Sequence, residues 1–271
     1  MFLPENIDLA NSENYNLSIR LAPNGFSFCI NSPNDPSVFY FQETSIGTKL
    51  SYLESIKKFV FDLGIFSNNF NKSSVFVVSK NYTLVPDQFF DQNLTRELFN
   101  FNFHAPEGVI LNDKSLNDEF HIVYNLDEEV HSFIIRHLSY PTLHHHSTLL
   151  IYAFENLERG CSEKECFIDF HDEYMTVVCF ANNKLLTANT FAETNTFNIS
   201  YFVMGIWNKL GFDQNTDKLY LSGNIESQNK VEGELKGMIR NIESVELSPI
   251  TTLTEEQKQK VPTDLIATLC V

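Results

Sequence analysis

The chain of 271 residues carries 35 acidic and 19 basic side chains, a formal net charge of −16, and 43% of its residues are hydrophobic. This composition can bury one large core or two smaller ones, which excludes a disordered chain. The negative average field repels other polyanions and therefore argues against nucleic acid or an anionic membrane surface as a partner.

The N-terminus and the cysteines predict a cytoplasmic protein. The first 16 residues lack the basic region and apolar core of a signal peptide, and the longest apolar runs are far shorter than the ~18 residues of a membrane span. Cys29 and Cys179 lie in apolar strand-like segments and are interpreted as core residues. Cys161 and Cys166 are spaced more widely than a redox or zinc pair. We therefore expect reduced thiols and no direct insertion into a membrane.

The first part of the chain predicts three strands, a helix and a fourth strand. Apolar alternation on both sides of Pro23-Asn24-Gly25 is typical of a hairpin. A stripe of apolar residues that begins at Leu50 predicts a helix, with Gly64 as its C-terminal cap. The expected elements are a hairpin at 16–30, strands at 37–43 and 74–79, and a helix at 50–66.

Further elements are expected between residues 81 and 160. Pro86 begins one helix, Asp127 caps a second, and Ser147 caps a third that ends at Gly160. The phenylalanines of the run at 99–103 alternate with asparagine, so they form either one buried face or, if exposed, a partner groove. The expected elements are helices at 86–101, 128–138 and 147–159 and strands at 108–113 and 119–126.

The second half of the chain repeats the order of the first. Ile19 and Ile168 are offset by 149 residues, and Gly64 and Gly211 by 147, a drift expected of two copies that differ by short loop changes. Trp207 is expected in the core. The elements are a hairpin at 166–180, strands at 184–192 and 218–223, a helix at 196–212, and then a helix at 230–242, a strand at 244–247 and a charged helix at 251–261.

The predicted order of three antiparallel strands, a helix, a strand, a second helix and a last strand occurs twice. This order resembles the duplicated ribonuclease H-like lobes of the actin, heat-shock-70 and sugar-kinase superfamily. The chain is most similar to its divergent bacterial members, the actin-like pilus-assembly proteins and the type II secretion scaffold protein. It resembles a bacterial family of unknown function with this fold. The resemblance implies an α/β protein of two tandem actin-like lobes, residues 1–160 and 161–271, each a mixed five-stranded sheet with flanking helices.

The resemblance also implies where a nucleotide would bind. Active members have an aspartate and a glycine-rich turn in the first hairpin of each lobe, whose N–H groups and metal-bound water hold the phosphates. In lobe one, Arg20 stands at the aspartate position, and Pro23 in the turn has no N–H to donate. In lobe two, Asp169 matches, but its turn carries His171, Asp172 and Glu173. Carboxylates ~4 Å from a polyphosphate cost on the order of 1 kcal/mol per facing charge, so phosphate binding is disfavoured.

A third family signature is a strand that ends in two glycines near the adenosine, and this sequence has one of the two glycines. The sequence has Ser222, Gly223 and Asn224, and a lone glycine after a strand is equally a plain turn. The sequence therefore predicts a vestigial nucleotide cleft. We assign Asp169, Ser222, Gly223 and Asn224 to this cleft and expect Arg20, His171, Asp172 and Glu173 to face it.

The sequence also bears on a metal site and on a nuclease site. On a strand, His144 and His146 share a face, and with a carboxylate they could bind a metal; such histidines more often form surface or interlobe hydrogen bonds. A ribonuclease H-like nuclease would need several converging carboxylates, but Arg20 occupies the place that matches Asp169, and the net charge is wrong for a polyanionic substrate. No metal and no catalytic residue is expected.

The sequence predicts a non-enzymatic scaffold or adaptor that binds a protein partner through its cleft or a lobe edge, without a cofactor. The alternative is a conformational switch that binds Mg-ATP weakly through Asp169 and Ser222-Gly223-Asn224 and closes its lobes on it. A peptide bound between the lobes would favour the first function. Nucleotide affinity that depends on Mg²⁺ would favour the second.

Overall fold

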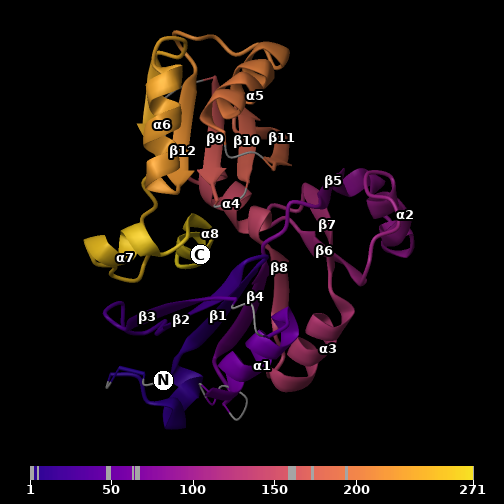
Figure 1. Ribbon diagram of the computed structural model, residues 1–271, viewed down its shortest axis with the longest axis vertical. Coiled ribbons are helices and arrows are strands. Elements are labelled where there is room, and N and C mark those ends of the chain that lie inside the picture. Colours follow the sequence, from indigo (N-terminus) through magenta and orange to yellow (C-terminus); the bar gives the residue numbers. More distant parts are fainter. Residues whose placement is uncertain are drawn as a thin grey trace. The chain divides into compact units, whose positions relative to one another are not determined.

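The computed structural model describes residues 3–4, 6–46, 50–62, 64, 68–157, 163–171, 174–192 and 195–270. It is an α/β protein with two five-stranded mixed sheets flanked by helices and one three-stranded antiparallel sheet (Figure 1). The two larger sheets have the same strand order, the arrangement expected of a duplication. The predicted fold class is confirmed.

The chain divides into two compact units. The first comprises Met1–Thr148, Pro249–Val261 and Thr268–Val271, and the second comprises Leu149–Ser248 and Pro262–Ala267. The C-terminal segment therefore contributes to both units. We keep the division at residues 160 and 161 as a proposal for the limits of the two repeats.

The first five-stranded sheet has the order β3-β2-β1-β4-β8. A short 3₁₀ helix (Leu9–Asn14) precedes it. The central strand β1 pairs antiparallel with β2 and parallel with β4, as a split β-α-β arrangement requires. Its strands are β1 (Asn16–Ala22), β2 (Gly25–Asn31), β3 (Phe39–Ser45), β4 (Lys72–Val77) and β8 (Thr142–His145).

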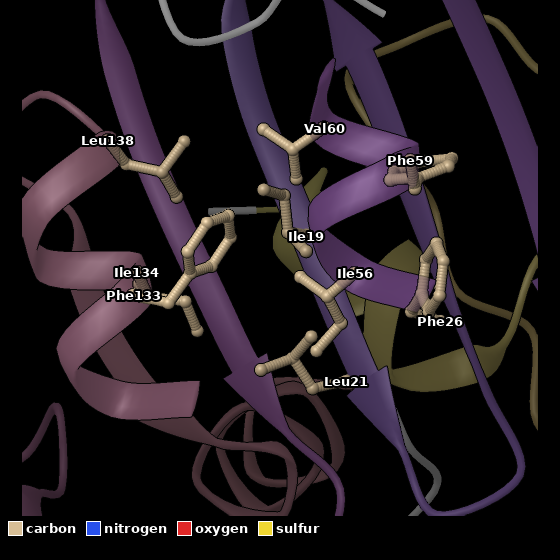
Figure 2. Close-up of a pocket in the computed structure, with 9 residues that line it drawn as sticks. All are labelled: Ile19, Leu21, Phe26, Ile56, Phe59, Val60, Phe133, Ile134 and Leu138. Carbon is tan, nitrogen blue, oxygen red and sulfur yellow. The ribbon is translucent and has the colours of Figure 1, made fainter. Parts of the chain in front are cut away.

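Helices α1 (Tyr52–Asp62) and α3 (Glu128–His137) pack on this sheet. Figure 2 shows side chains from β1, β2 and both helices around an apolar cavity of about 10 Å³, which is too small and apolar to favour a bound water. The cavity is lined by Ile19, Leu21, Phe26, Ile56, Phe59, Val60, Phe133, Ile134 and Leu138. The predicted Asp127 cap of α3 is confirmed, since its carboxylate accepts the Val130 N–H at 2.9 Å. Leu50, expected in the apolar stripe, instead precedes α1 and is exposed.

A three-stranded sheet of order β5-β7-β6 is inserted between β4 and α3. The expected helix at 86–101 is wrong, because the segment forms two 3₁₀ helices and only one short α-helix. The Asp91 side chain accepts the Asn93 N–H at 2.8 Å, a local bond that competes with a continuous helix. The elements are β5 (Tyr82–Pro86), η3 (Asp87–Phe89), η4 (Gln92–Leu94), α2 (Thr95–Asn100), β6 (Val109–Lys114) and β7 (Phe120–Leu126).

The phenylalanines at 99–103 do not share one environment. Phe99 is buried and stacks on Phe103 at 4.8 Å, whereas Phe101 is 87% exposed. The segment ends α2 and does not form a strand, so side chains two residues apart point in different directions.

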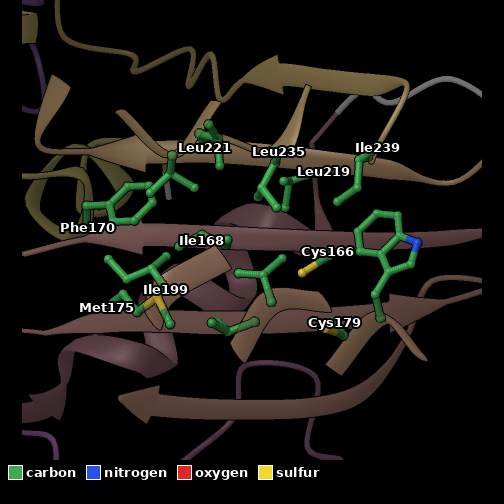
Figure 3. Close-up of a cluster of buried hydrophobic side chains, with 14 of the residues drawn as sticks. Cys166, Ile168, Phe170, Met175, Cys179, Ile199, Leu219, Leu221, Leu235 and Ile239 are labelled. Carbon is green, nitrogen blue, oxygen red and sulfur yellow. The ribbon is translucent and has the colours of Figure 1, made fainter. Parts of the chain in front are cut away.

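The second five-stranded sheet has the order β11-β10-β9-β12-β13, and helices α5 and α6 pack on one of its faces. Figure 3 shows their apolar side chains against those of β9, β10 and β12. Trp207 is fully buried there, as predicted. The elements are β9 (Lys164–Phe170), β10 (Met175–Ala181), β11 (Lys184–Phe191), α5 (Thr196–Lys209), β12 (Lys218–Gly223), α6 (Ile225–Leu235) and β13 (Asn241–Ser244).

The helix caps confirm the equivalence of the two repeats. Gly64 after α1 and Gly211 after α5 have φ angles of +67° and +66°, the left-handed conformation in which glycine ends a helix. The predicted offset of 147 residues therefore joins structurally equivalent positions.

Several boundaries near the C-terminus differ from the prediction. Asn224 caps α6 by accepting the Ser227 N–H at 3.0 Å, so this helix begins earlier than residue 230 and ends at Leu235. The final strand β13 precedes the expected 244–247 because its register is set by parallel pairing with β12. The charged helix is confirmed as α7 (Glu255–Lys260), with a capping box at its start, and α8 (Thr263–Thr268) was not predicted.

Helix α4 (His146–Glu155) begins one residue before its expected cap. Ser147 lies inside the helix and is fully buried, so it is not a cap. Its N–H donates to the Nδ1 atom of His145 at 3.3 Å. The expected end at Gly160 lies outside the described residues.

The described cysteines have free thiols. Cys29, Cys166 and Cys179 are buried free thiols, and burial raises the pKa of Cys29 to about 12. Cys161 lies outside the described residues. Within the described part of the chain, every helix is too short or too polar to cross a bilayer.

Leu235 provides a test of the second core. Leu235→Ala should lower the free energy of unfolding by about 2–5 kcal/mol, because it removes buried methyl groups and leaves a cavity. Met238→Ala, three residues further on at an exposed position, should change it by less than about 0.5 kcal/mol. Urea unfolding followed by Trp207 fluorescence measures both. Equal effects of the two changes would contradict the end of α6 at Leu235.

Candidate functional site

Two parallel strands bring the predicted lobe-two residues together. β9 and β12 pair in a register that places Asp169 opposite Ser222 and Phe170 opposite Gly223. Asp169 is only 1% exposed. The Ser222 hydroxyl donates to its Oδ1 at 2.7 Å, and the His171 Nε2 atom lies 3.0 Å from its Oδ2. Thr263, the first residue of α8, also hydrogen-bonds this carboxylate.

These contacts keep the buried carboxyl group ionised. Burial raises the pKa of Asp169, but the adjacent His171 ring and hydrogen bonds from His171, Ser222 and Thr263 outweigh burial and hold it below its ordinary value. His171 is fixed in turn, because its ring stacks on Tyr174 at 4.4 Å and its backbone N–H donates to the Tyr174 carbonyl at 2.9 Å. The site is a buried carboxylate held by a histidine ring and two hydroxyl side chains.

Gly223 and Asn224 have structural roles at the end of β12. Gly223 has a φ angle of +83°, and a Cβ atom there would lie 2.2 Å from the Phe170 carbonyl oxygen. Only glycine allows β12 to pass β9 this closely. The Asn224 N–H donates to that same carbonyl at 3.0 Å, and its side chain caps α6.

The equivalent hairpin of the first repeat is different. Arg20 lies in β1, is buried, and stands close enough to Tyr52 for its charge to oppose the rise that burial causes in the pKa of that phenol. The turn between β1 and β2 has only two residues, Pro23 and Asn24. The Asn24 carbonyl accepts the Ile46 N–H at 3.1 Å. This turn is a tight hairpin and not a phosphate loop.

The described residues do not fit a magnesium-bound nucleotide. A metal-bound water needs a carboxylate oxygen that is open to it, but both oxygens of Asp169 are engaged by protein donors in a buried setting. Pro23 removes an N–H from the other hairpin. Asp172 and Glu173, expected to face the cleft, lie outside the described residues, and that part of the prediction stays a prediction, as does the expectation for Arg20 and His171.

The histidines at 144–146 are divided between two elements. β8 ends at His145 and α4 begins at His146, so the expectation that His144 and His146 share a strand face is wrong. Asp113 of β6 instead contacts both His144 and His145. Its Oδ1 lies 3.0 Å from His144 Nδ1, and its Oδ2 accepts the backbone N–H of His145 at 3.0 Å. Among the described residues, no three histidine, cysteine, aspartate or glutamate side chains lie together as a metal site would require.

His145 is a neutral core residue that the sequence did not single out. Its Nε2 lies 3.1 Å from the Ser79 carbonyl, while its Nδ1 accepts the Ser147 N–H. The rings of Tyr82 and Tyr124 lie 4.7 Å and 5.1 Å away. Burial lowers the pKa of His145 to about 3, and attraction to Asp113 only partly opposes this effect.

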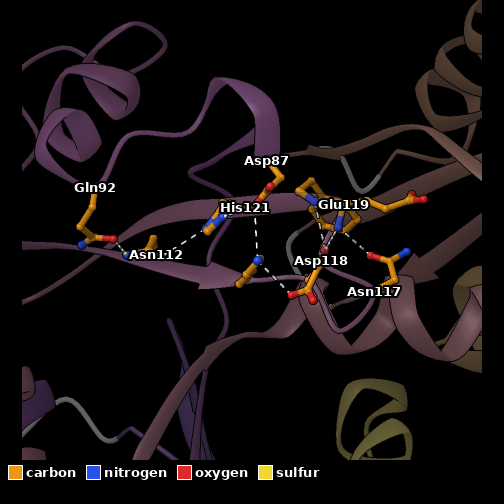
Figure 4. Close-up of polar contacts among 10 residues, drawn as sticks. Asp87, Gln92, Asn112, Asn117, Asp118, Glu119 and His121 are labelled. Carbon is orange, nitrogen blue, oxygen red and sulfur yellow. Dashed lines mark hydrogen bonds and ion pairs between the residues drawn. The ribbon is translucent and has the colours of Figure 1, made fainter.

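A second histidine network, also missed in the sequence, stabilises the inserted sheet. The two ring nitrogens of His121 lie 3.2 Å from Asp87 Oδ1 and 3.4 Å from Asn112 Oδ1 (Figure 4). Its ring stacks on Phe90 at 3.6 Å. Hydrogen bonds from His121 and Lys114 keep the pKa of Asp87 below its ordinary value. The network joins β6, β7 and η3 and is therefore structural.

The fold and the site define a protein of the actin-like ATPase fold. A solved structure from Bacteroides thetaiotaomicron, described as a protein with actin-like ATPase fold and unknown function, is 25% identical with a TM-score of 0.84, covering 98% of this chain and 99% of that chain. A chain of the PilM–PilN type IV pilus biogenesis complex is 12% identical with a TM-score of 0.63, covering 94% and 96%. None of the curated proteins matches the chain.

The protein belongs to the family described as "Protein of unknown function (DUF3822)", which it matches over residues 4–242. The resemblance to a bacterial family of unknown function with an actin-like fold is thereby confirmed.

Substitution of Asp169 tests the buried carboxylate. Asp169→Asn keeps the shape but removes the charge, so the hydrogen bonds from His171, Ser222 and Thr263 weaken together and the free energy of unfolding should fall by about 3–5 kcal/mol. Ser222→Ala removes one hydrogen bond to a charged group and should cost about 1.5–3 kcal/mol. Asp62→Asn, at an exposed position near the end of α1, is the control. If urea unfolding gave the same stability for the Asp169 and Asp62 variants, the charge of Asp169 would contribute nothing to stability.

His145 predicts a dependence of stability on pH. Its pKa is about 3 when folded against 6.5 in the unfolded chain, so below about pH 6.5 only the unfolded state binds this proton. The contribution of His145 to the free energy of unfolding is therefore lost as pH falls, by up to about 1.4 kcal/mol per pH unit between pH 6 and 4. His145→Gln should reduce the measured slope by that amount, and His131→Gln on α3 should not. An unchanged slope in His145→Gln would contradict the buried neutral ring.

Proposed function

We propose that the protein is a non-enzymatic scaffold or adaptor that binds another protein and whose nucleotide cleft is degenerate. The observation that carries this proposal is the buried Asp169 carboxylate, whose oxygens are engaged by Ser222, His171 and Thr263. Opening it to a metal would break buried hydrogen bonds to a charged group, at a cost of several kcal/mol. Pro23 and the tight first hairpin support the same conclusion.

The likeness to PilM–PilN supports a docking role. That structure joins a chain of this fold to a second protein in a pilus biogenesis complex. At 12% identity the likeness concerns the fold alone, so the step to a protein partner for this chain is an analogy. We extend the proposal to a cytoplasmic location and, on the net charge of −16, to partners other than nucleic acid.

A nucleotide-regulated switch is the second candidate. It is favoured by one observation: Asp169, Ser222, Gly223 and Asn224 remain adjacent at the ends of β9 and β12. Binding would require His171 to leave the carboxylate, and the affinity would be correspondingly weak.

Calorimetric titration separates the two functions. We expect no binding heat with Mg-ATP or Mg-ADP up to millimolar concentration, and the same result for Asp169→Ala. Nucleotide binding with a dissociation constant below about 100 μM, a binding free energy of roughly −5.5 kcal/mol, would instead establish the switch if Asp169→Ala abolished that binding. A protein captured from cells of the source organism should then bind the purified chain with the same affinity in the presence and absence of nucleotide. Binding that requires Mg-ATP would contradict the scaffold.

A further inference from the structure

Helix α5 exposes a row of aromatic side chains on the face opposite its core. Phe197 and Tyr201, one turn apart, are 73% and 72% exposed. Phe202 is partly exposed and stacks on Phe191 of the edge strand β11 at 5.3 Å. The other face of the helix already supplies the core with Ile199, Val203 and Trp207. Aromatic side chains on both faces of a helix are typical of a helix whose two faces are both buried against other protein groups.

The equivalent helix of the first repeat has charged side chains at two of the corresponding positions. At the offset of 147 residues, the buried Ile56 and Val203 correspond, so the two helices are in register. At the same offset, Glu54 of α1 corresponds to Tyr201, and Lys58 corresponds to Gly205. Both side chains are charged, as is typical of the solvated face of a helix, and the Glu54 carboxylate accepts the Ser51 N–H at 2.9 Å. The second repeat has replaced this pair with an aromatic ring and a glycine.

Gly205 has no reason to be glycine within its own chain. It lies in the interior of α5, where glycine costs about 1 kcal/mol relative to alanine. No described atom lies within 4 Å of a Cβ atom built on it, and its φ angle is not positive. A glycine here leaves room for the close approach of a group from outside the chain.

The charge of the region indicates which partner approaches. Between residues 175 and 209, the sequence has one acidic side chain, Glu193, and two basic ones, Lys184 and Lys209, in a chain of net charge −16. Two copies of such an acidic chain repel each other over most of their surface, so a self-contact is favoured where acidic groups are sparse. The face of α5 meets this condition.

We propose that α5 packs antiparallel against α5 of a second copy, across a twofold axis near Tyr201. Phe197 and Gly205 each lie four residues from Tyr201, about 6 Å along the helix axis in opposite directions. The twofold rotation therefore places Phe197 of each copy over Gly205 of the other, a ring filling the space that a side chain would occupy. The contact is self-complementary, as an isologous dimer interface must be. It is independent of the proposed scaffold function.

Sedimentation equilibrium of the full chain between about 1 and 100 μM tests this dimer. The unaltered protein should be a dimer, and Phe197→Asp and Tyr201→Asp should each raise the dissociation constant at least about 100-fold, as expected for central aromatic residues of an interface. Gly205→Leu should also give monomers, although leucine favours the helix itself. Phe101→Asp, at an 87% exposed phenylalanine of the inserted segment, is the matched control and should remain dimeric.

Trp207 fluorescence and thermal unfolding establish that each variant is folded. A monomeric unaltered protein at 100 μM would overturn the proposal, and so would a dimer that survives both aspartate substitutions. If the unaltered protein is monomeric but a different protein binds it and fails to bind Tyr201→Asp, the face belongs to that partner and the self-contact is wrong. Because this test uses neither nucleotide nor a captured partner, its failure is distinguishable from failure of the scaffold proposal.

Discussion

A buried carboxylate joins three parts of the second unit. Asp169 lies near the end of β9, Ser222 near the end of β12, and Thr263 at the start of α8, and all three meet in one hydrogen-bonded group with His171. An unpaired charge at this depth would be far too costly, so the hairpin, the neighbouring strand and the C-terminal helix must all be in place together. The same contacts that stabilise the carboxylate occupy the atoms that a metal would need.

The two repeats keep one backbone and differ in their polar side chains. Strand order and the left-handed glycines after α1 and α5 are shared, because apolar packing and backbone pairing define them. The exposed and partly exposed positions have diverged, for example from Glu54 to Tyr201. Packing tolerates such changes outside the core, so a duplicated fold can acquire a new contact surface on one copy alone.

The sequence predicted the large sheets well and the candidate site in part. Period-two alternation and helical stripes identified the shared strands and both repeated helices, because these patterns are local. The position of Asp169 followed from the repeat, but its partner Thr263 did not, since α8 is distant in sequence and was not expected. The helix at 86–101 was wrong because Asp91 forms its own local turn, and His145 gave no signal because a buried and an exposed histidine have the same sequence pattern.

The sequence by itself determined the repeated order of elements, the α/β class and the family resemblance, since these depend on residue periodicity and on the order of the predicted strands and helices. The tertiary structure alone decided that the Asp169 carboxylate is closed by His171, that His145 is neutral in a core of two tyrosine rings, and that Phe197 and Tyr201 lie on an open face. The physical reason is that burial and ionic pairing depend on residues brought together by the fold, and no local pattern records which side chain will cover another.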